Sequence, residues 1–269
     1  MKICFIGGGN MATALIGGLL GRGFTAQQMS VVEINTDNRA KLQQAFGVRT
    51  SENIAGGIAG SEVIVLAVKP QQLREVAQQL APMLSGQLLI SIAAGILATD
   101  LARWSNSQAI VRAMPNTPAL IRSGITGLYA LPTVTEKQHA QAQDILAAVG
   151  EILWLQDEAM MDAVTAISGS GPAYVFYFIE ALQQAAQKLG FNAPDARRLS
   201  LATFLGASKL ASASDEDVGV LRARVTSKNG TTERALLSLS ADLVAEHIGQ
   251  AAQAAAARSR EMGKELSKE

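Results

Sequence analysis

Three consecutive glycines, Gly7 to Gly9, follow a short apolar run and open a helical pattern. The segment Ile6-Gly7-Gly8-Gly9-Asn10-Met11-Ala12 matches the spacing G-x-G-x-x-G/A. In a strand, turn and helix, the first glycine permits the tight turn, the second lets backbone approach a pyrophosphate, and the third small residue keeps helix and strand close. Free N–H groups at the helix start attract the anion. We therefore predict dinucleotide contacts at Ile6, Gly7, Gly9, Asn10, Met11 and Ala12. The alternative is a glycine-rich turn without a ligand.

Glu33 stands at the end of the second predicted strand, where a carboxylate would bond the adenosine 2′-hydroxyl and repel a 2′-phosphate. Taken alone, Glu33 favours NADH. Asn35 and Arg39 come next, and a guanidinium there would pair with a 2′-phosphate if Glu33 turned away. Arg39 is equally interpretable as a solvated charge on a helix face. The sequence leaves the choice between NADPH and NADH open.

The first part of the chain alternates short β-branched runs with helical patterns, as a parallel sheet with crossover helices does. The predicted helices are Asn10–Gly21, Asp37–Phe46, Gln71–Ala81 and Glu136–Val149. The predicted strands are Lys2–Ile6, Ser30–Glu33, Val63–Val68, Leu88–Ala93, Ala109–Ala113, Thr126–Ala130 and Ile152–Leu155. We expect an α/β fold of Rossmann type, with a doubly wound and mostly parallel sheet, over residues 1–156.

After residue 156 the strand-like runs disappear and Ala, Leu, Gln and Ser recur with helical period. Residues 157–269 are therefore predicted to form an all-α domain. The small side chains allow close helix packing, including packing across a subunit interface. The predicted helices run from Asp157 to Ala166, are interrupted at Ser168–Pro172, and continue at Tyr174–Leu189, Asp195–Ser212, Asp215–Val225, Thr232–Leu239 and Ala241–Leu266.

Ligands of open parallel sheets bind beyond the carboxyl ends of the strands. Small residues and prolines directly follow three of the predicted strands. They would form a rigid surface against which the ribose and nicotinamide of a cofactor could lie. Lys69 is also interpretable as an exposed strand-end lysine, and Asn116 as an ordinary turn asparagine. The predicted cofactor contacts from these segments are Ala67, Val68, Lys69, Pro70, Ala94, Gly95 and Asn116.

The segment from Val225 to Thr232 lies between two predicted helices and is rich in hydroxyl residues. Thr231 or Thr232 is expected to start the second of these helices. One interpretation is a plain N-cap loop. The other is a pocket in which backbone N–H groups and hydroxyls at a helix start receive a small carboxylate.

Composition excludes several classes of protein. The 23 basic and 23 acidic side chains cancel, so no global basic field attracts nucleic acid. The single cysteine, Cys4, and two separated histidines give no metal-ligand cluster and indicate a reducing cytoplasm. The glycines and Asn10 interrupt the apolar N-terminal run, which argues against a secretion signal. The next apolar stretch, Leu88 to Ala98, is too short to span a membrane.

Five motifs in order resemble those of the Δ1-pyrroline-5-carboxylate reductases. They are Phe5-Ile6-Gly7-Gly8-Gly9-Asn10-Met11, Ala67-Val68-Lys69-Pro70-Gln71, Arg112-Ala113-Met114-Pro115-Asn116-Thr117-Pro118-Ala119, Ser168-Gly169-Ser170-Gly171-Pro172-Ala173-Tyr174 and the Val225–Thr232 loop. The resemblance implies a Rossmann domain, a helical dimerisation domain, homodimers that build into a larger ring, and reduction of a cyclic imine carboxylate to L-proline by NADPH or NADH. It also implies that the substrate is held by Ser227, Asn229, Gly230, Thr231 and Thr232.

The last loop departs from the usual Ser-Pro-Gly-Gly-Thr-Thr of similar enzymes, because Lys228 and Asn229 replace the proline and the first glycine. Asparagine tolerates positive φ better than most residues, so we expect the turn to survive. Lys228 adds a cation near the expected carboxylate site. The resemblance implies that Thr232, as the catalytic residue, bonds the imine nitrogen, and no metal is required.

Two rival functions remain open from the residues themselves. A hydroxyacid dehydrogenase also joins a Rossmann domain to helices, but it needs an acid–base group for a hydroxyl proton, and neither histidine has a supporting motif. A non-catalytic dinucleotide-sensing protein would use the alanine-rich helices for assembly alone. That protein would bind the cofactor without turnover.

Overall fold

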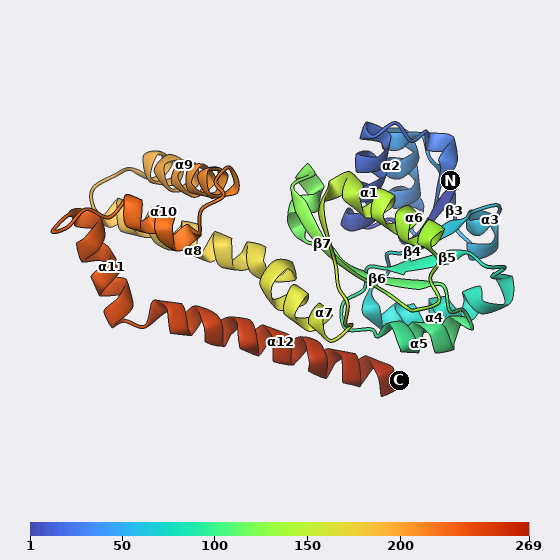
Figure 1. Ribbon diagram of the computed structural model, residues 1–269. Coiled ribbons are helices and arrows are strands. Elements are labelled where there is room, and N and C mark those ends of the chain that lie inside the picture. The colour runs from blue at the N-terminus through green and yellow to red at the C-terminus, as the bar shows by residue number, and fades with distance from the viewer. Residues whose placement is uncertain (269) are drawn as a thin grey trace. The chain divides into compact units, whose positions relative to one another are not determined.

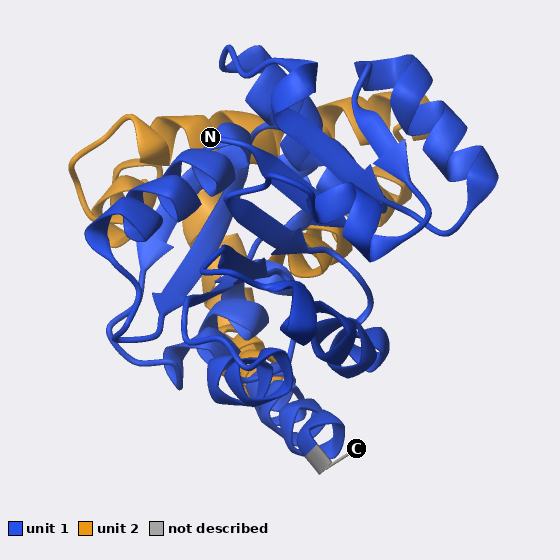
Figure 2. Ribbon diagram, turned by 90° about the vertical axis from the view of Figure 1, so that its right-hand side faces the viewer, with its two compact units in different colours: residues 1–170, 254–269 blue, residues 171–253 orange. Residues whose placement is uncertain are grey.

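The computed structural model describes residues 1–268 and divides into two compact units. The first unit holds Met1–Ser170 together with the C-terminal stretch that begins at Ala254, and the second holds Gly171–Gln253 (Figure 2). Residues 157–170 therefore belong to the same compact unit as the sheet. The predicted domain boundary after residue 156 stays a prediction.

An eight-stranded sheet forms the centre of the first unit (Figure 1). Its order is β3-β2-β1-β4-β5-β6-β7-β8, and every neighbouring pair is parallel except β6 with β7. A short link joins those two strands, which suits an antiparallel pair, whereas a parallel pair needs a longer crossover. The bounds are β1 Ile3–Ile6, β2 Met29–Val32, β3 Arg49–Ser51, β4 Val63–Leu66, β5 Leu88–Ser91, β6 Ile110–Met114, β7 Gly124–Ala130 and β8 Gly150–Trp154.

Helices cover both faces of this sheet (Figure 1). One face carries α1 (Asn10–Gly21), α2 (Thr36–Phe46) and α6 (Glu136–Leu146), and the other carries α4 (Pro70–Leu80) and α5 (Ala98–Ser105). The short α3 (Ile54–Ile58) packs beside β1, β2 and β3. The doubly wound, mostly parallel α/β fold is thereby confirmed.

Local chemistry sets the ends of these helices. The Asn35 side chain accepts a hydrogen bond from Asn38 N at 2.9 Å and caps α2, which ends at Gly47 with φ 67°. Pro70 occupies the first turn of α4, where a missing N–H costs nothing. Thr135 and Gln138 form a capping box at the start of α6.

The core lies between the sheet and its two helical layers. Phe5, Leu15, Ile64 and Leu89 have no accessible side-chain surface, and strands β1, β2, β4 and β5 are buried along their whole length. Strands covered on both faces read as continuous apolar runs. That is why the predicted strands are all present, with ends that shift by a few residues.

Three short elements were not predicted: β3, α3 and α5. β3 is the polar tripeptide Arg49–Ser51 and α3 contains two adjacent glycines, so neither shows a periodic apolar pattern. α5 begins with the Ala98 N–H bonded to the Glu158 carboxylate at 2.7 Å. Glu158 also pairs with the buried Arg112 at 2.9 Å, a contact between residues far apart in sequence.

The predicted interruption at Ser168–Pro172 is a change of helix type and not a loop. α7 (Met160–Val164) runs into a π-helical turn at Thr165–Gly169, and α8 (Gly171–Lys188) follows. Within the first unit, the C-terminal part of α12 (Val244–Lys268) packs near α7, where Ser259 donates to the Asp162 carboxylate at 2.6 Å.

The second unit is entirely helical in its described residues. α8 packs along α9 (Ala193–Ser212), and α10 (Val218–Arg224), α11 (Thr231–Ala241) and the first part of α12 follow. Leu243, at φ 52°, separates α11 from α12. Large apolar side chains stay exposed on these helices in the single chain, with Phe176 at 65% and Leu205 at 59% exposure. Faces of this kind are typical of a protein–protein interface.

No helix within residues 1–268 is both long and apolar enough to cross a membrane. Over the same residues, no group of three His, Cys, Asp or Glu side chains is placed to hold a metal ion.

Candidate active site

The glycine-rich turn sits between the carboxyl ends of three strands. Gly7 has φ 99°, and its N–H donates to Val32 O at the end of β2 at 2.8 Å. A Cβ at Gly7 would lie 2.5 Å from Ala67 O, just beyond β4. Only glycine satisfies both the positive φ and this approach. The turn therefore occupies the point where strand order reverses between β1 and β4, which is the usual dinucleotide crevice.

Gly9 serves a different purpose from Gly7. It caps α1 in an extended conformation without a side-chain cap, and a Cβ there would meet no atom within 4 Å. The first amides of α1 therefore face open space without intrahelical acceptors. Ala12 is fully buried one turn later, where a larger side chain would push the helix off the sheet. This cradle fits a pyrophosphate.

Gly8 has a structural role that the motif spacing does not reveal. Its N–H donates to Glu33 Oε2 at 3.1 Å, and its carbonyl accepts from Asn38 Nδ2 at 3.0 Å. Asn38 Nδ2 also bonds Glu33 Oε2 at 2.9 Å. A Cβ at Gly8 would press against Leu42 Cδ1 at 2.6 Å. The Gly8 peptide is thus clamped on both sides by α2 and the end of β2.

The Glu33 carboxylate is engaged at both oxygens. Oε1 accepts from Asn35 N at 2.9 Å, while Oε2 takes the two bonds just described. Partial burial by itself raises the pKa of Glu33, but the hydrogen bonds from Asn35, Asn38 and Gly8 outweigh it and hold the pKa below its usual value. Glu33 is therefore a charged support of the turn at neutral pH.

Arg39 is turned toward the connection between β2 and α2. Its Nη1 donates to Glu33 O at 2.7 Å and Ile34 O at 2.9 Å, and its Nη2 donates to Thr36 Oγ1 at 3.1 Å. Nη2 also lies 3.5 Å from the Glu52 carboxylate. These contacts show a guanidinium that braces the loop. Its contact with a cofactor stays a prediction.

A crevice of about 770 Å³ opens over this turn. Seven of the predicted cofactor residues line it: Ile6, Gly7, Gly9, Glu33, Ala67, Val68 and Lys69. Residues that the sequence analysis missed line it as well, including Gly8, Ile34, Asn53 and Gln72. Asn53 follows β3 and caps α3, so it was missed because neither element was predicted.

The other predicted contacts lie outside the lining of that crevice. Asn10, Met11 and Ala12 belong to the first turn of α1, Asn35 caps α2, and Pro70 starts α4. Gly95 is buried after β5 at φ 84°, a conformation that favours glycine, and a Cβ there would lie 3.3 Å from Gly263 N of α12. Ala94 precedes it and is half-buried.

Asn116 lies just beyond β6 with its amide fixed in orientation. Oδ1 accepts from Ile125 N at 3.0 Å, and Nδ2 points to Ser168 Oγ at 3.2 Å. The residue is half-buried and caps the short 3₁₀ turn Thr117–Ile121.

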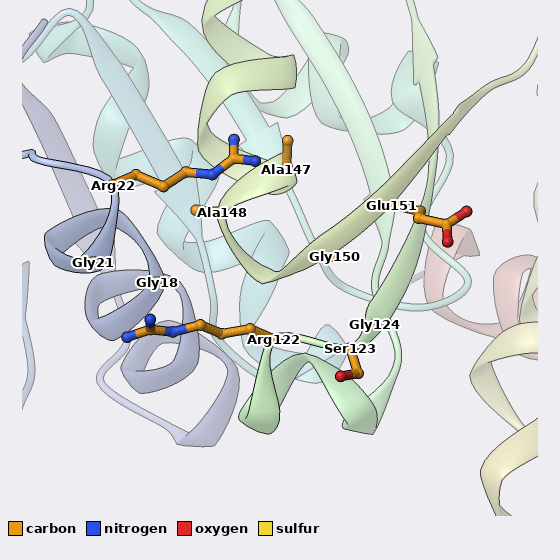
Figure 3. A pocket seen from close by; sticks show the side chains of 10 residues that line it. All are labelled: Gly18, Gly21, Arg22, Arg122, Ser123, Gly124, Ala147, Ala148, Gly150 and Glu151. Atoms are coloured by element: carbon orange, nitrogen blue, oxygen red, sulfur yellow. The ribbon is translucent and has the colours of Figure 1, made fainter. Parts of the chain in front are cut away.

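A second pocket of about 620 Å³ lies where the end of α1 meets the starts of β7 and β8 (Figure 3). Arg122 reaches toward α1, and its Nη2 donates to Gly17 O at 3.0 Å. Arg122 therefore satisfies a carbonyl near the helix end. None of the predicted site residues lines this pocket, which separates it from the dinucleotide crevice.

In the second unit, the hydroxyl-rich loop ends at α11, which begins at Thr231 as expected. Asn229 adopts φ 61°, so the turn is present with asparagine in the left-handed conformation, as expected. The Asn229 N–H donates to Glu233 Oε2 at 2.7 Å, and the Gly230 N–H donates to Ser227 O at 3.0 Å. A Cβ at Gly230 would collide with Ser227 Oγ.

The start of α11 is therefore exposed at the end of this loop. Ser227, Asn229 and Thr231 are exposed, and Thr232 is half-buried. The first amides of α11 lack intrahelical acceptors, as at any helix start. Glu233 was missed from the sequence, although an acidic residue at the third helical position is the usual sign of a tether back to the preceding loop.

The strand, glycine turn and helix over an open crevice define the protein as a member of the Rossmann-type dinucleotide-binding class. Two family models each match a part of the chain. One, described as "NADP oxidoreductase coenzyme F420-dependent", matches residues 2–95, and one described as "Pyrroline-5-carboxylate reductase dimerisation" matches residues 158–262.

The chain is similar over its whole length to known pyrroline-5-carboxylate reductases. It is 47% identical to that of Pseudomonas aeruginosa and 46% to that of Haemophilus influenzae, covering 98% and 97% of both chains in each pair. A solved pyrroline-5-carboxylate reductase from Coxiella burnetii superposes with a TM-score of 0.93 at 39% identity, covering 97% of this chain and 98% of that one. The chain belongs to the pyrroline-5-carboxylate reductase family.

Proposed function

We propose that the protein reduces L-1-pyrroline-5-carboxylate to L-proline with NADPH or NADH. The observation that carries the proposal is the clamped glycine turn over an open crevice, in a chain that matches pyrroline-5-carboxylate reductases along its full length. A solved relative from Plasmodium falciparum, with a TM-score of 0.87 and 30% identity over 98% of each chain, has NADP bound.

The residues of the first unit fit such a cofactor. The open space at Gly9 and the unpaired amides of α1 suit the pyrophosphate, and Lys69 adds a positive charge to the crevice wall. Glu33 and Asn35 border the adenosine end, with Arg39 behind them. We assign cofactor contacts to Ile6, Gly7, Gly9, Asn10, Met11, Ala12, Glu33, Asn35, Arg39, Ala67, Val68, Lys69, Pro70, Ala94, Gly95 and Asn116.

The reaction requires little covalent chemistry from the side chains of the protein. When bound, the reduced cofactor would supply a hydride and be oxidised, so that a C–H bond would form at the imine carbon while the C=N double bond becomes single. The nitrogen keeps the proton that it already carries and gains the electron pair of the broken π bond. Orientation and exclusion of water then provide most of the acceleration.

The loop before α11 is assigned to the substrate. The hydroxyls of Ser227 and Thr231, the side-chain amide of Asn229 and the first amides of α11 after Gly230 suit a small carboxylate at a helix start. Thr232, half-buried in the first turn, is assigned the hydrogen bond to the imine nitrogen. It is the catalytic residue of the proposal.

The assembly and location follow from the same reasoning. The dimerisation family and the exposed apolar faces of the second unit support a homodimer, which we propose builds into a ring of dimers. The buried Cys4 has no partner for an internal disulfide, which supports a reducing cytoplasm. Light scattering on a sizing column measures the assembly: a mass equal to one chain would contradict it.

The decisive experiment compares oxidation of NADPH and NADH by the purified protein with pyrroline carboxylate. We expect turnover with the imine and none with 2- or 3-hydroxyacids and the oxidised cofactors. Cofactor binding without turnover would instead support the sensing protein. Turnover on hydroxyacids alone would support the dehydrogenase.

Thr232→Ala tests the catalytic assignment. Loss of one hydrogen bond in the transition state should lower kcat about tenfold or more. The dissociation constant for NADPH should not change. Thr226→Ala is the matched control, because the Thr226 hydroxyl donates to Arg222 O at 2.7 Å and serves the helix end. Equal activity of Thr232→Ala and wild type would remove the assigned role.

A further inference from the structure

A π-helical turn places Ser168 beside the carboxyl end of β6. The Ser170 N–H donates to Thr165 O at 2.8 Å, five residues back, where an α-helix would bond four residues back. Pro172 has no N–H, so it cannot donate to the carbonyl of Ser168 and a regular helix cannot run through this point. Single π turns inside helices occur frequently at functional sites.

Close packing holds this turn against the sheet. A Cβ at Gly169 would lie 2.6 Å from Met114 Cε at the end of β6, and a Cβ at Gly127 of β7 would lie 2.8 Å from Val164 Cγ1. Glycine at both positions lets helix and strands approach closely. The position of Ser168 relative to β6 is therefore fixed by the fold.

The hydrogen bonds around Asn116 determine the orientation of its side-chain amide and the direction of the Ser168 hydroxyl proton. Ile125 N is a donor, so the atom that faces it must be the amide oxygen of Asn116. The amide nitrogen then faces Ser168 and donates to Oγ at 3.2 Å. Ser168 is the acceptor in this pair, and its own hydroxyl proton points elsewhere.

That proton has no protein acceptor among residues 1–268. Other helical hydroxyls donate to the carbonyl four residues back, as Ser105, Thr165 and Ser200 do at 2.7, 2.8 and 2.9 Å. Ser168 makes no such bond in the described structure, although it is half-buried. A donor left free inside a rigid framework is available to a ligand.

Ser168 lies beyond the carboxyl end of β6, on the side of the switch point opposite β2 and β3. In a doubly wound sheet, the pyrophosphate sits at the first glycine turn, and the two nucleotides extend to opposite sides of the switch point. The Glu33 side, at β2 and β3, takes the adenosine. A bound nicotinamide would then extend over the carboxyl ends of β4, β5 and β6, and Ser168 lies at the last of these, beside Asn116.

We propose that Ser168 is a cofactor-binding residue whose hydroxyl donates a hydrogen bond to the carboxamide oxygen of the nicotinamide ring. The carboxamide is the polar group of that ring, so a fixed donor at this oxygen sets which ring face is presented. Asn116, which is assigned to the cofactor site above, acts there through Ser168 as the positioning residue: its oxygen and nitrogen are engaged by Ile125 N and Ser168 Oγ, and its amide directs the Ser168 proton toward the ligand. This assignment rests on the proposed function, since it requires a nicotinamide cofactor in the crevice.

The test measures binding rather than activity. Ser168→Ala should weaken NADP⁺ binding about tenfold, the loss expected for one hydrogen bond. Binding of 2′-phospho-ADP-ribose, which lacks the nicotinamide, should equal that of wild type. Titration calorimetry gives both dissociation constants. Unchanged NADP⁺ affinity, or equal losses for both ligands, would overturn the assignment.

A second variant covers the case in which Ser168→Ala fails to fold. Asn116→Asp keeps an oxygen for Ile125 N but replaces the donor at Ser168 with an acceptor, which diverts the serine proton away from the ligand. We expect the same nicotinamide-dependent loss of affinity, and full NADP⁺ affinity would overturn the proposal.

Ser105→Ala is the matched control for loss of a helical hydroxyl in the same unit, and both affinities should stay at wild-type values. Failure of wild-type protein to bind NADP⁺ at all would refute the proposed function itself. That result is distinct from a wild type that binds NADP⁺ and a Ser168→Ala variant that binds it equally well.

Discussion

The carboxylate of Glu33 accepts a hydrogen bond from the main-chain N–H of Gly8 at 3.1 Å, so the end of β2 holds the glycine turn that follows β1. Asn38 bonds both partners and closes the clamp. The acidic residue expected to meet a ribose hydroxyl is thus also part of the support of the pyrophosphate cradle. A change at Glu33 acts on the shape of the turn and on the charge at the adenosine end together.

Glu33→Gln should shift cofactor preference toward NADPH. The negative charge of the Glu33 carboxylate repels a 2′-phosphate. Removal of one such charge near the surface changes the free energy of cofactor binding by roughly 1 to 2 kcal/mol. We expect the ratio of kcat/KM for NADPH to that for NADH to rise about tenfold. Glu62→Gln is the matched control, because Glu62 also accepts a backbone N–H, from Lys2 at 3.1 Å, but lies outside this crevice. A ratio that moves toward NADH would contradict the assignment.

The stability contributed by Glu33 should depend on pH in a defined direction. The folded protein lowers the pKa of Glu33 from the ordinary 4.5, so its contribution is present above that value and is lost as the pH falls through the folded pKa. Wild type should unfold at higher urea than Glu33→Gln at neutral pH, and the charge-dependent gap should narrow as the pH falls below about 4.5 and close below the lowered pKa of Glu33. Carbon NMR of the Glu33 carboxyl gives a direct check. Titration at or above the ordinary value would show that the clamp is not formed in solution.

Periodicity predicted the sheet because its strands are continuous apolar runs bounded by turns. The glycine motif was predictable for the same reason: strand, turn and helix are adjacent in sequence. Gly8 with Glu33, and Gly95 with Gly263, are pairs that only tertiary packing brings together. A single sequence carries no local signal for such pairs. The polar β3, with Asn53 at its end, was missed because it has no apolar alternation.

The region around Ser168 shows a different kind of limit. Glycine and proline indicated a disturbance in the helix, and the structure contains one. Their presence does not distinguish a loop from a π turn, because both result from loss of the regular backbone bond. The partner of Ser168 is Asn116, and that pairing depends on how α7 packs on β6 and β7.

Gly7→Ala and Gly9→Ala should separate folding from binding. At Gly7, φ is 99° and a Cβ would lie 2.5 Å from Ala67 O, so the substitution should destabilise the fold by about 2 kcal/mol or more. At Gly9, φ is −71° and a Cβ meets nothing, so stability should stay close to wild type. The Gly9 variant should instead bind NADPH at least tenfold more weakly, because its methyl group enters the pyrophosphate space. Urea unfolding and fluorescence titration measure the two effects. A stable Gly7→Ala protein, or a Gly9→Ala protein with full affinity, would refute this division.

Asn229→Gly and Asn229→Ala distinguish a backbone role from a side-chain role in the loop before α11. Asn229 sits at φ 61°, which glycine adopts freely and alanine adopts only at a cost of about 1 kcal/mol. Its N–H, which either variant retains, anchors the loop to Glu233 at 2.7 Å. If the backbone conformation is what shapes the carboxylate site, Asn229→Gly should keep the wild-type KM for pyrroline carboxylate and Asn229→Ala should raise it about fivefold. The KM for NADPH should stay constant in both, because the cofactor contacts lie in the first unit. Equal increases in both variants would mean that the asparagine amide itself contacts the substrate.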